Sequence, residues 1–184
     1  SAKLIRNQVI VAGRGSAEQL PEGLYSRFRH NHVSGPVCRH VRVHLVKKRT
    51  DKQLAKCIAP ILERWLKRLD LYNTWFVRLE IVCGASLPEA DDADSTVLAS
   101  IDFSDPYKRA EISLNRELAA TMSDADLDHN LLHELVHVLM RPMVHAAWEH
   151  IPKADRKHFQ RAHESVTDTF TNLLLWDSKG ERNR

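Results

Sequence analysis

The sequence predicts an α+β domain in which a short, mostly antiparallel sheet packs on two long helices. Three short segments, residues 75–83, 97–103 and 109–114, alternate apolar and polar side chains as half-buried strands do. Two longer segments, residues 124–140 and 153–176, repeat apolar side chains at helical spacing. Only a short turn separates the last two strands, so we expect that pair to be antiparallel.

The chain is long enough for one globular domain with an N-terminal arm. Its 184 residues are 43% hydrophobic and 28% charged, which is typical of a folded domain with a core. Residues 1–36 scatter glycine and proline among charges, so we expect a mostly irregular arm with a short strand inside residues 4–12. The domain is expected to span residues 37–178, with a polar tail at 179–184.

Composition also indicates the cellular compartment in which the protein is expected. No run reaches the roughly 18–20 consecutive apolar residues that a membrane span needs, so we expect no membrane partner. The cysteines Cys38, Cys57 and Cys83 are odd in number, widely spaced and outside any C-x-x-C pair. This pattern argues against a disulfide framework and favours a reducing compartment, so a cytoplasmic location is predicted.

Positive charge is concentrated near the N-terminus. Residues 1–52 contain eleven Lys and Arg against three Asp and Glu, whereas the whole chain carries only +3. A basic segment can contact nucleic acid or another acidic partner, and a merely solvated arm explains the same composition. Nearby, His30, His32, Cys38 and His40 match no zinc-binding spacing.

The spacing of apolar residues predicts a strand and a helix at the start of the domain. Residues 37–46 alternate as a half-exposed strand, and a helix over 51–71 follows, with Asp51 as its N-cap and Pro60 inside it. Residues 84–95 then form an acidic, proline-containing loop, which is ordinarily solvated rather than a cation site.

The pattern H-E-x-x-H lies inside the helix predicted from residue 124 to 140, at His133, Glu134 and His137. Histidines four residues apart differ by about 40° around a helix, so both point the same way and can each give zinc a nitrogen. Glu134 is offset by one residue, which places it to activate a zinc-bound water as a general base. An ordinary core helix with two hydrogen-bonded histidines is the alternative.

This helix has a start signal and a stop signal. Ser123 can act as its N-cap, and two aspartates in the first turn favour the positive end of the helix dipole. Pro142 should end the helix just after residue 140. A short helix over 144–151 is then expected in the connection to the last helix.

The last helix offers a third ligand. Glu164 and Asp168 are four residues apart, hence on one face. A catalytic zinc site uses three protein ligands and one open position, so Glu164 can complete the set. Asp168 can accept the second ring N–H of a ligating histidine. The same helix carries an apolar stripe at helical spacing, formed by Val166, Phe170, Leu173 and Leu174.

The two motifs, H-E-L-V-H and E-S-V-T-D-T-F-T-N-L-L-L, resemble those of the gluzincin branch of zincin metallopeptidases, closest to small cytosolic and phage-encoded ImmA/IrrE-like zinc peptidases. The resemblance covers residues 73–176. It implies a zincin-like fold, one Zn²⁺ held by the three ligands, and an endopeptidase acting on a protein or peptide. It also implies that the strand before the metal helix lies at the sheet edge and pairs with the substrate. That strand is Ala110, Glu111, Ile112, Ser113 and Leu114.

The sequence offers alternatives for the third ligand, for the oxyanion donor and for the function. The 27-position gap from His137 to Glu164 contains two prolines, so His145, His158 or His163 could supply the third ligand instead. No residue is singled out as the oxyanion donor, for which the candidates are His129, His145, His150 and His158. A zincin-fold binding module that contacts DNA or a protein through the basic N-terminal region is the competing functional hypothesis.

Overall fold

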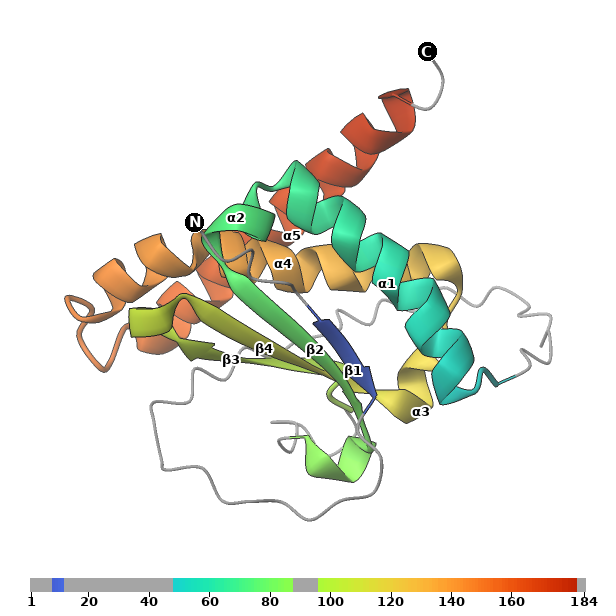
Figure 1. The fold of residues 1–184 in the computed structure, drawn as a ribbon. Helices are drawn as coiled ribbons and strands as arrows, with labels where there is room; N and C mark the ends of the chain where they lie inside the picture. The colour runs from blue at the N-terminus through green and yellow to red at the C-terminus, as the bar shows by residue number, and fades with distance from the viewer. Residues whose placement is uncertain (1–7, 12–47, 88–95, 182–184) are drawn as a thin grey trace, which may run out of the picture.

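In a computed structural model, the protein is an α+β fold with its helices gathered on one face of a four-stranded sheet (Figure 1). The structure describes residues 8–11, 48–87 and 96–181. The strand expected at residues 37–46, most of the arm, the candidate histidines near its end and most of the acidic loop lie outside these residues. Among the described residues, no helix has the length and apolar character needed to cross a membrane.

The sheet has the strand order β1-β2-β4-β3. Its strands are β1 (Gln8–Val11), β2 (Phe76–Val82), β3 (Ala99–Ser104) and β4 (Arg109–Asn115). The predicted α+β class is confirmed, but the expectation of a mostly antiparallel sheet is wrong. The short turn η2 (Asp105–Tyr107) does make β3 and β4 antiparallel, whereas β2 is parallel to both β1 and β4. Parallel pairing joins segments that are distant in sequence, so alternation within a strand cannot reveal it.

β4 is an interior strand, which corrects the edge position expected for Ala110, Glu111, Ile112, Ser113 and Leu114. Its seven residues pair with β2 on one side, and six of them pair with β3 on the other. The backbone groups of β4 are therefore used inside the sheet and are not open to a peptide substrate. On this side of the sheet, β3 is the outer strand of the described residues.

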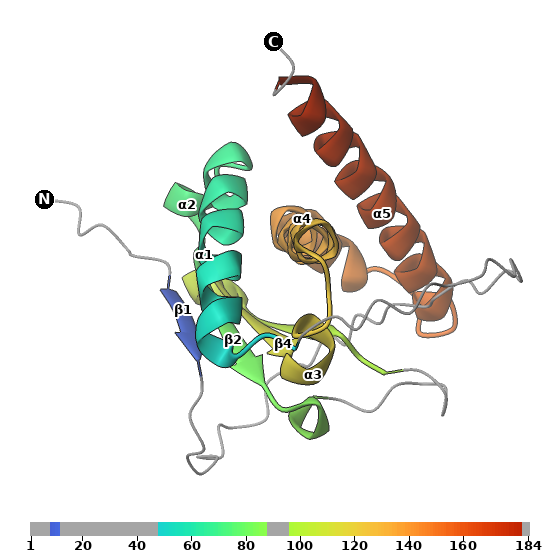
Figure 2. The ribbon, with the colours of Figure 1, turned by 90° about the vertical axis from the view of Figure 1, so that its right-hand side faces the viewer.

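One face of the sheet forms the core. Leu79 on β2, Ile112 on β4 and Ile101 on β3 lie in one register row, and all three side chains are buried. Side chains at alternate positions point to opposite faces, so buried and part-exposed residues alternate along β2. Helices α1 and α4 cover the buried face, as Figures 1 and 2 show.

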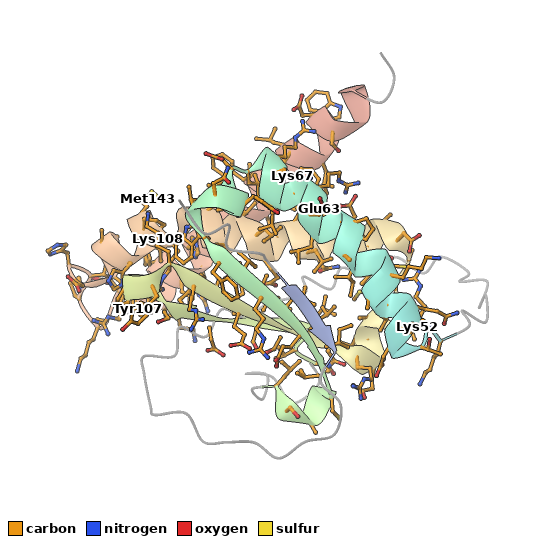
Figure 3. The ribbon with its side chains drawn as sticks, viewed as in Figure 1. Lys52, Glu63, Lys67, Tyr107, Lys108 and Met143 are labelled. Atoms are coloured by element: carbon orange, nitrogen blue, oxygen red, sulfur yellow. The ribbon has the colours of Figure 1, made fainter. Side chains whose placement is uncertain are left out.

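Helix α1 (Asp51–Arg68) packs its apolar stripe against this core. Thr50, rather than the expected Asp51, is the N-cap, and it forms a capping box with Gln53. Pro60 lies inside the helix, as expected. Charged side chains occupy the outer side of the helix, where Lys67 bonds Glu63 one turn earlier at 2.6 Å (Figure 3). Short helices α2 (Leu71–Thr74), η1 (Gly84–Ser86) and α3 (Arg116–Ala119) complete the connections.

Helix α4 (Asp124–Trp148) crosses the sheet and carries the H-E-x-x-H pattern. Ser123 caps its N-terminus, as predicted. The helix continues through Pro142, so the expected stop before this residue and the separate short helix after it are wrong. A proline removes one backbone hydrogen bond. The helix is nevertheless held on both sides of Pro142: Arg141, just before it, forms a two-bond contact with Asp105, and Val144, just after it, is buried.

Helix α5 (Arg156–Glu181) packs along α4 on the side away from α1 (Figure 2). Its buried positions are occupied by His163, Thr167, Thr171 and Ser178. Most of the apolar stripe that identified this helix in the sequence instead lies outward. The fully buried side chains of α5 are therefore small or polar, and Leu174 and Leu175 pack against the core beside them.

Candidate metal centre

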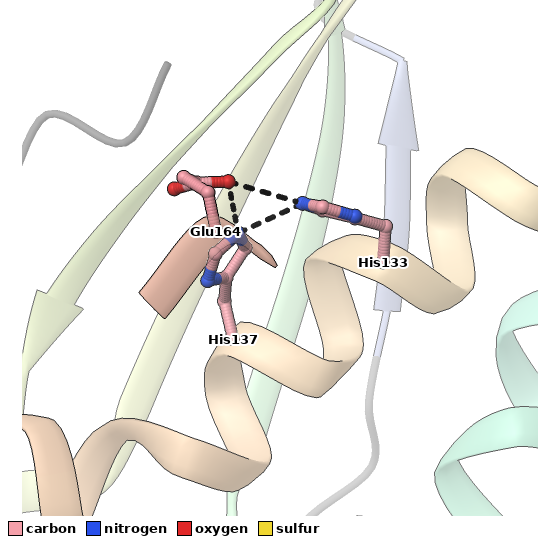
Figure 4. A group of neighbouring side chains, drawn as sticks. All are labelled: His133, His137 and Glu164. Carbon is pink, nitrogen blue, oxygen red and sulfur yellow. Dashed lines mark hydrogen bonds and ion pairs between the residues drawn. The ribbon is translucent and has the colours of Figure 1, made fainter. Parts of the chain in front are cut away.

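Three side chains from two helices meet at one point (Figure 4). His133 and His137 of α4 place their Nε2 atoms 2.9 Å apart, and Oε2 of Glu164 on α5 lies 3.5 Å from each of them. Both histidine side chains are almost fully buried, and the Glu164 side chain is 19% exposed. Within the described part of the chain, these three residues form the group that could hold a metal ion.

The triangle has the size that a tetrahedral metal site requires. Ligands at about 2.0–2.2 Å from zinc are about 3.3–3.6 Å from one another in a tetrahedron. The three donor atoms lie at 2.9, 3.5 and 3.5 Å, so a small ion fits with shifts of a few tenths of an ångström. The second oxygen of Glu164, Oε1, is buried and makes no hydrogen bond with the described residues. A buried carboxylate oxygen without a donor is consistent with a cation at this position.

Local structure explains why the donors converge. His133 and His137 are one turn apart on a helix whose other faces are packed with Leu131, Leu132, Leu135 and Val138. That packing fixes the rotation of α4 and directs the two imidazoles toward α5. Glu164 then reaches them because α5 lies directly against α4.

The electrostatics of the centre keep Glu164 ionised. Burial raises the pKa of Glu164, but hydrogen bonds with His133 and His137 outweigh it and hold this pKa at about 2. Burial lowers the pKa of His133, yet the bond with Glu164 and the negative charges of Glu134 and Asp168 raise it overall. The site is therefore negatively charged and favours a cation.

Two further carboxylates flank the ligands. Asp168 Oδ1 lies 3.0 Å from His133 Nδ1, the ring nitrogen that faces away from the triangle. Glu134 follows His133 in sequence and is only 4% exposed. The structure thus brings together four of the residues expected at the site, His133, His137, Glu164 and Asp168, and buries Glu134 next to them.

The alternative third ligands lie outside the triangle. His145 is half exposed and faces Asp105, at 3.7 Å, and His158 is on the exposed side of α5. His163 is buried and its ring lies 4.9 Å from that of His137, but it is not a member of the ligand group. Burial and the nearby His137 lower the pKa of His163 to about 4, so this ring is neutral at pH 7.

One buried ion pair near the centre was missed in the sequence. Arg141, one turn beyond His137, donates two hydrogen bonds of 2.8 and 2.6 Å to Asp105, the residue that follows β3. Its guanidinium also lies 4.6 Å from the ring centroid of Phe103. Spacing of four residues places Arg141 on the same face of α4 as His133 and His137. Its partner Asp105 follows β3, and only the fold brings that strand end close to α4.

Comparison with known proteins gave no match: no family model fits the chain, and no curated protein or solved structure is significantly similar to it. The chemistry of the site therefore rests on its own geometry.

Proposed function

We propose that this protein is a zinc-dependent metalloendopeptidase of the gluzincin type. The observation that carries the proposal is the triangle of His133 Nε2, His137 Nε2 and Glu164 Oε2, with Glu134 buried beside it. Two imidazoles and one carboxylate are a donor set typical of catalytic zinc. Three protein ligands leave the fourth position open for water or substrate.

The donor set favours zinc over the common hard cations. Ca²⁺ and Mg²⁺ are usually bound by six or more oxygen atoms, whereas this group contains two nitrogens and one carboxylate. Imidazole suits zinc and several other transition metals, so the geometry favours a tetrahedral ion of that class. Elemental analysis of the purified protein identifies the metal directly.

The residues of the chain then perform the proton transfers of peptide hydrolysis. A zinc ion held by the triangle would act as a Lewis acid and lower the pKa of water to about 7. Glu134 accepts a proton from the attacking water as its oxygen bonds to the carbonyl carbon of the substrate. Glu134 next donates this proton to the amide nitrogen, the C–N bond breaks, and a carboxylate and an amine are released. Asp168 holds His133 in the tautomer that leaves Nε2 unprotonated.

The outer strand β3 supports an extended peptide as substrate. Within the described residues β3 pairs only with β4, so its other side offers a row of backbone donors and acceptors. β3 ends at Ser104, and the next residue, Asp105, is bonded to α4 one turn beyond His137. A peptide paired along β3 would therefore pass α4 near Arg141, one turn beyond His137.

Replacing Glu134 by glutamine tests the proposal. Glu134→Gln preserves the size of the side chain but cannot accept the proton, so hydrolysis of a peptide library should fall about 100-fold or more. Metal content and far-UV circular dichroism should match wild type. Glu149→Gln is the matched control, because it makes the same chemical change at an exposed position at the end of α4 and should leave hydrolysis unchanged.

Equal cleavage by wild type and Glu134→Gln would contradict the peptidase mechanism. Protein that contains no transition metal, and does not bind Zn²⁺ when it is added, would contradict the metal centre itself. Intact metal binding without cleavage of any peptide would favour the binding-module alternative.

A further inference from the structure

The start of helix α5 carries positive charge close to the candidate metal centre. From residue 156 to 163 the helix contains Arg156, Lys157 and Arg161 and no acidic residue. Lys157 and Arg161 are exposed, whereas Arg156 lies over the ring of Trp148, 5.0 Å from its centroid. The dipole of a helix favours negative charge at its N-terminal end, so helix stability does not explain these cations.

Lys157 and Arg161 lie on the face of α5 that carries the candidate ligand Glu164. They precede Glu164 by seven and three residues, spacings that place all three side chains within about 60° around the helix. Residues three apart on a helix have Cβ atoms about 5–6 Å from each other, inside the ~8 Å over which charges interact at physiological salt. The acid just before the helix, Asp155, is nine residues from Glu164 and hence on the opposite side. The charge of Arg161 therefore acts at the candidate metal centre.

In the described part of the chain, Arg161 is the arginine with neither a carboxylate nor an aromatic ring as its partner. Six of the other arginines pair with carboxylates, and Arg109 and Arg156 lie over rings. Lys157 likewise forms no ion pair with a described residue, whereas Lys67 bonds Glu63. The two cations are therefore available to a negatively charged group of a ligand.

The first turns of α5 lie on the side of the sheet where β3 is the outer strand. In Figure 2, β1, β2 and β4 follow one another from left to right and α5 lies beyond them, and β3 comes after β4 in the strand order. The second half of α4 holds both parts: Arg141 bonds Asp105 at the end of β3, and the ring of Trp148 lies 6.1 Å from that of Phe159 on α5. A peptide paired along the outer side of β3 would therefore run between β3 and the first turns of α5.

We propose that Lys157 and Arg161 select peptide substrates that carry an acidic side chain close to the scissile bond, a selectivity that rests on the peptidase function proposed above. On the α4 side, Asp105 neutralises Arg141, so the two α5 cations supply the unbalanced positive charge. Arg161 lies about 4.5 Å from Glu164 along the helix axis, and an extended peptide advances about 3.4 Å per residue. The acidic side chain is therefore expected within about three residues of the bond that is cleaved. A nucleic-acid backbone suits the site less, because its binding normally uses many cations.

Cleavage-site profiling of the zinc-loaded whole chain tests this selectivity. A proteome-derived peptide library is digested, and mass spectrometry should show Asp or Glu enriched at a position within three residues of the cut. A synthetic peptide with that acid should then have a kcat/KM about fivefold above that of its Asn or Gln analogue, as expected for two exposed ion pairs. The difference should lie mainly in KM, because the contact is made equally in the ground state and the transition state. It should shrink as salt is added.

Two double variants and a matched control assign the effect to the two cations. Lys157→Gln with Arg161→Gln should abolish the preference, and Lys157→Glu with Arg161→Glu should shift it toward Lys and Arg. Lys52→Gln with Lys56→Gln makes the same change of charge at two exposed positions of α1, also four residues apart but on the other side of α4, and should keep the preference (Figures 2 and 3). Zinc content, circular dichroism and kcat for the uncharged analogue should be the same in wild type and in both glutamine variants.

The outcomes separate this selectivity from the peptidase proposal itself. Cleavage without a preference for acids, or with the same preference after Lys157→Gln and Arg161→Gln, would overturn the selectivity and leave the peptidase proposal intact. A wild-type protein that cleaves no peptide would overturn both. Salt-dependent binding of a DNA duplex that the same glutamine substitutions abolish, with peptide cleavage unaffected, would assign the two cations to nucleic acid and overturn the role proposed for them here.

Discussion

Asp168 on α5 lies 3.0 Å from His133 on α4, between Oδ1 and Nδ1. The contact joins the two helices that supply the candidate metal ligands, and it is made by the imidazole nitrogen that does not face the triangle. A carboxylate at this nitrogen fixes the ring orientation and makes the opposite nitrogen a better donor. The side chain of Asp168 is 60% exposed, so the contact is open to water.

Removing this carboxylate should weaken metal binding without unfolding the protein. Asp168→Ala is expected to lower zinc affinity about 10-fold, at the weak end of the range for such partners because the pair is exposed. Competition with a chromophoric chelator measures the affinity. Asp155→Ala, which removes an exposed carboxylate just before α5, should leave it unchanged. Identical affinities for Asp168→Ala and wild type would show that the contact does not support the site.

The Arg141–Asp105 pair should respond unequally to the loss of each partner. The Arg141 side chain is 9% exposed and Asp105 is 26% exposed. Asp105→Ala leaves a buried cation unpaired and should cost about 3 kcal/mol of unfolding free energy, whereas Arg141→Met leaves a carboxylate that water can reach and should cost about 1 kcal/mol. Urea denaturation measures both. The double variant should recover part of the loss, and strict additivity would mean that the two groups do not interact.

The buried His163 should make the metal-free protein less stable in mild acid. Its pKa falls from an ordinary value near 6.5 to about 4 on folding, so between these pH values the unfolded chain takes up a proton that the folded chain does not. Stability should therefore decrease as pH falls from about 6.5 to 4, by about 3 kcal/mol in total. The raised pKa of His133 acts above this window, and the lowered pKa of Glu164 acts mainly below pH 4.5.

Denaturation of chelator-treated protein at several pH values measures this effect. His163→Phe, which keeps a buried ring of similar shape, should flatten the decrease between pH 6.5 and 4.5. His158→Phe, at an exposed position of the same helix, should preserve it. An unchanged slope in His163→Phe would assign the acid sensitivity to another group.

Gly84 should not tolerate a side chain. A Cβ atom on Gly84 would lie 2.7 Å from Nδ2 of Asn115, which donates to the carbonyl of Val97 at 3.0 Å. The other side-chain atom of Asn115, Oδ1, caps α3 by accepting from two backbone N–H groups, so the side chain cannot move aside freely. Gly84→Ala should cost about 1–3 kcal/mol. The loss of unfolding free energy caused by Gly84→Ala should be smaller when Asn115 is also replaced by alanine. Urea denaturation of wild type, the two single variants and the double variant measures this difference.

Features that depend on local spacing were predictable from the sequence. The candidate ligands His133 and His137 point the same way because four residues make roughly one helical turn. Glu164 and Asp168 share a face for the same reason, and alternation located β2, β3 and β4 to within a few residues. Local geometry determines these relations wherever the helix or strand forms.

Features that depend on long-range packing were decided by the tertiary structure. Apolar and polar side chains alternate along β4 whether the strand lies at the edge or in the interior of the sheet. The strand order therefore depends on pairing between strands, which this pattern does not reveal. The apolar stripe of α5 predicted a helix but not which side would face α4, because small polar residues allow closer packing. Pro142 was tolerated because the Arg141–Asp105 pair before it and the buried Val144 after it hold the helix in place. Residue spacing was enough to identify the candidate ligands, whereas the packing of α5 on α4 brings Glu164, 27 residues beyond His137, into the triangle.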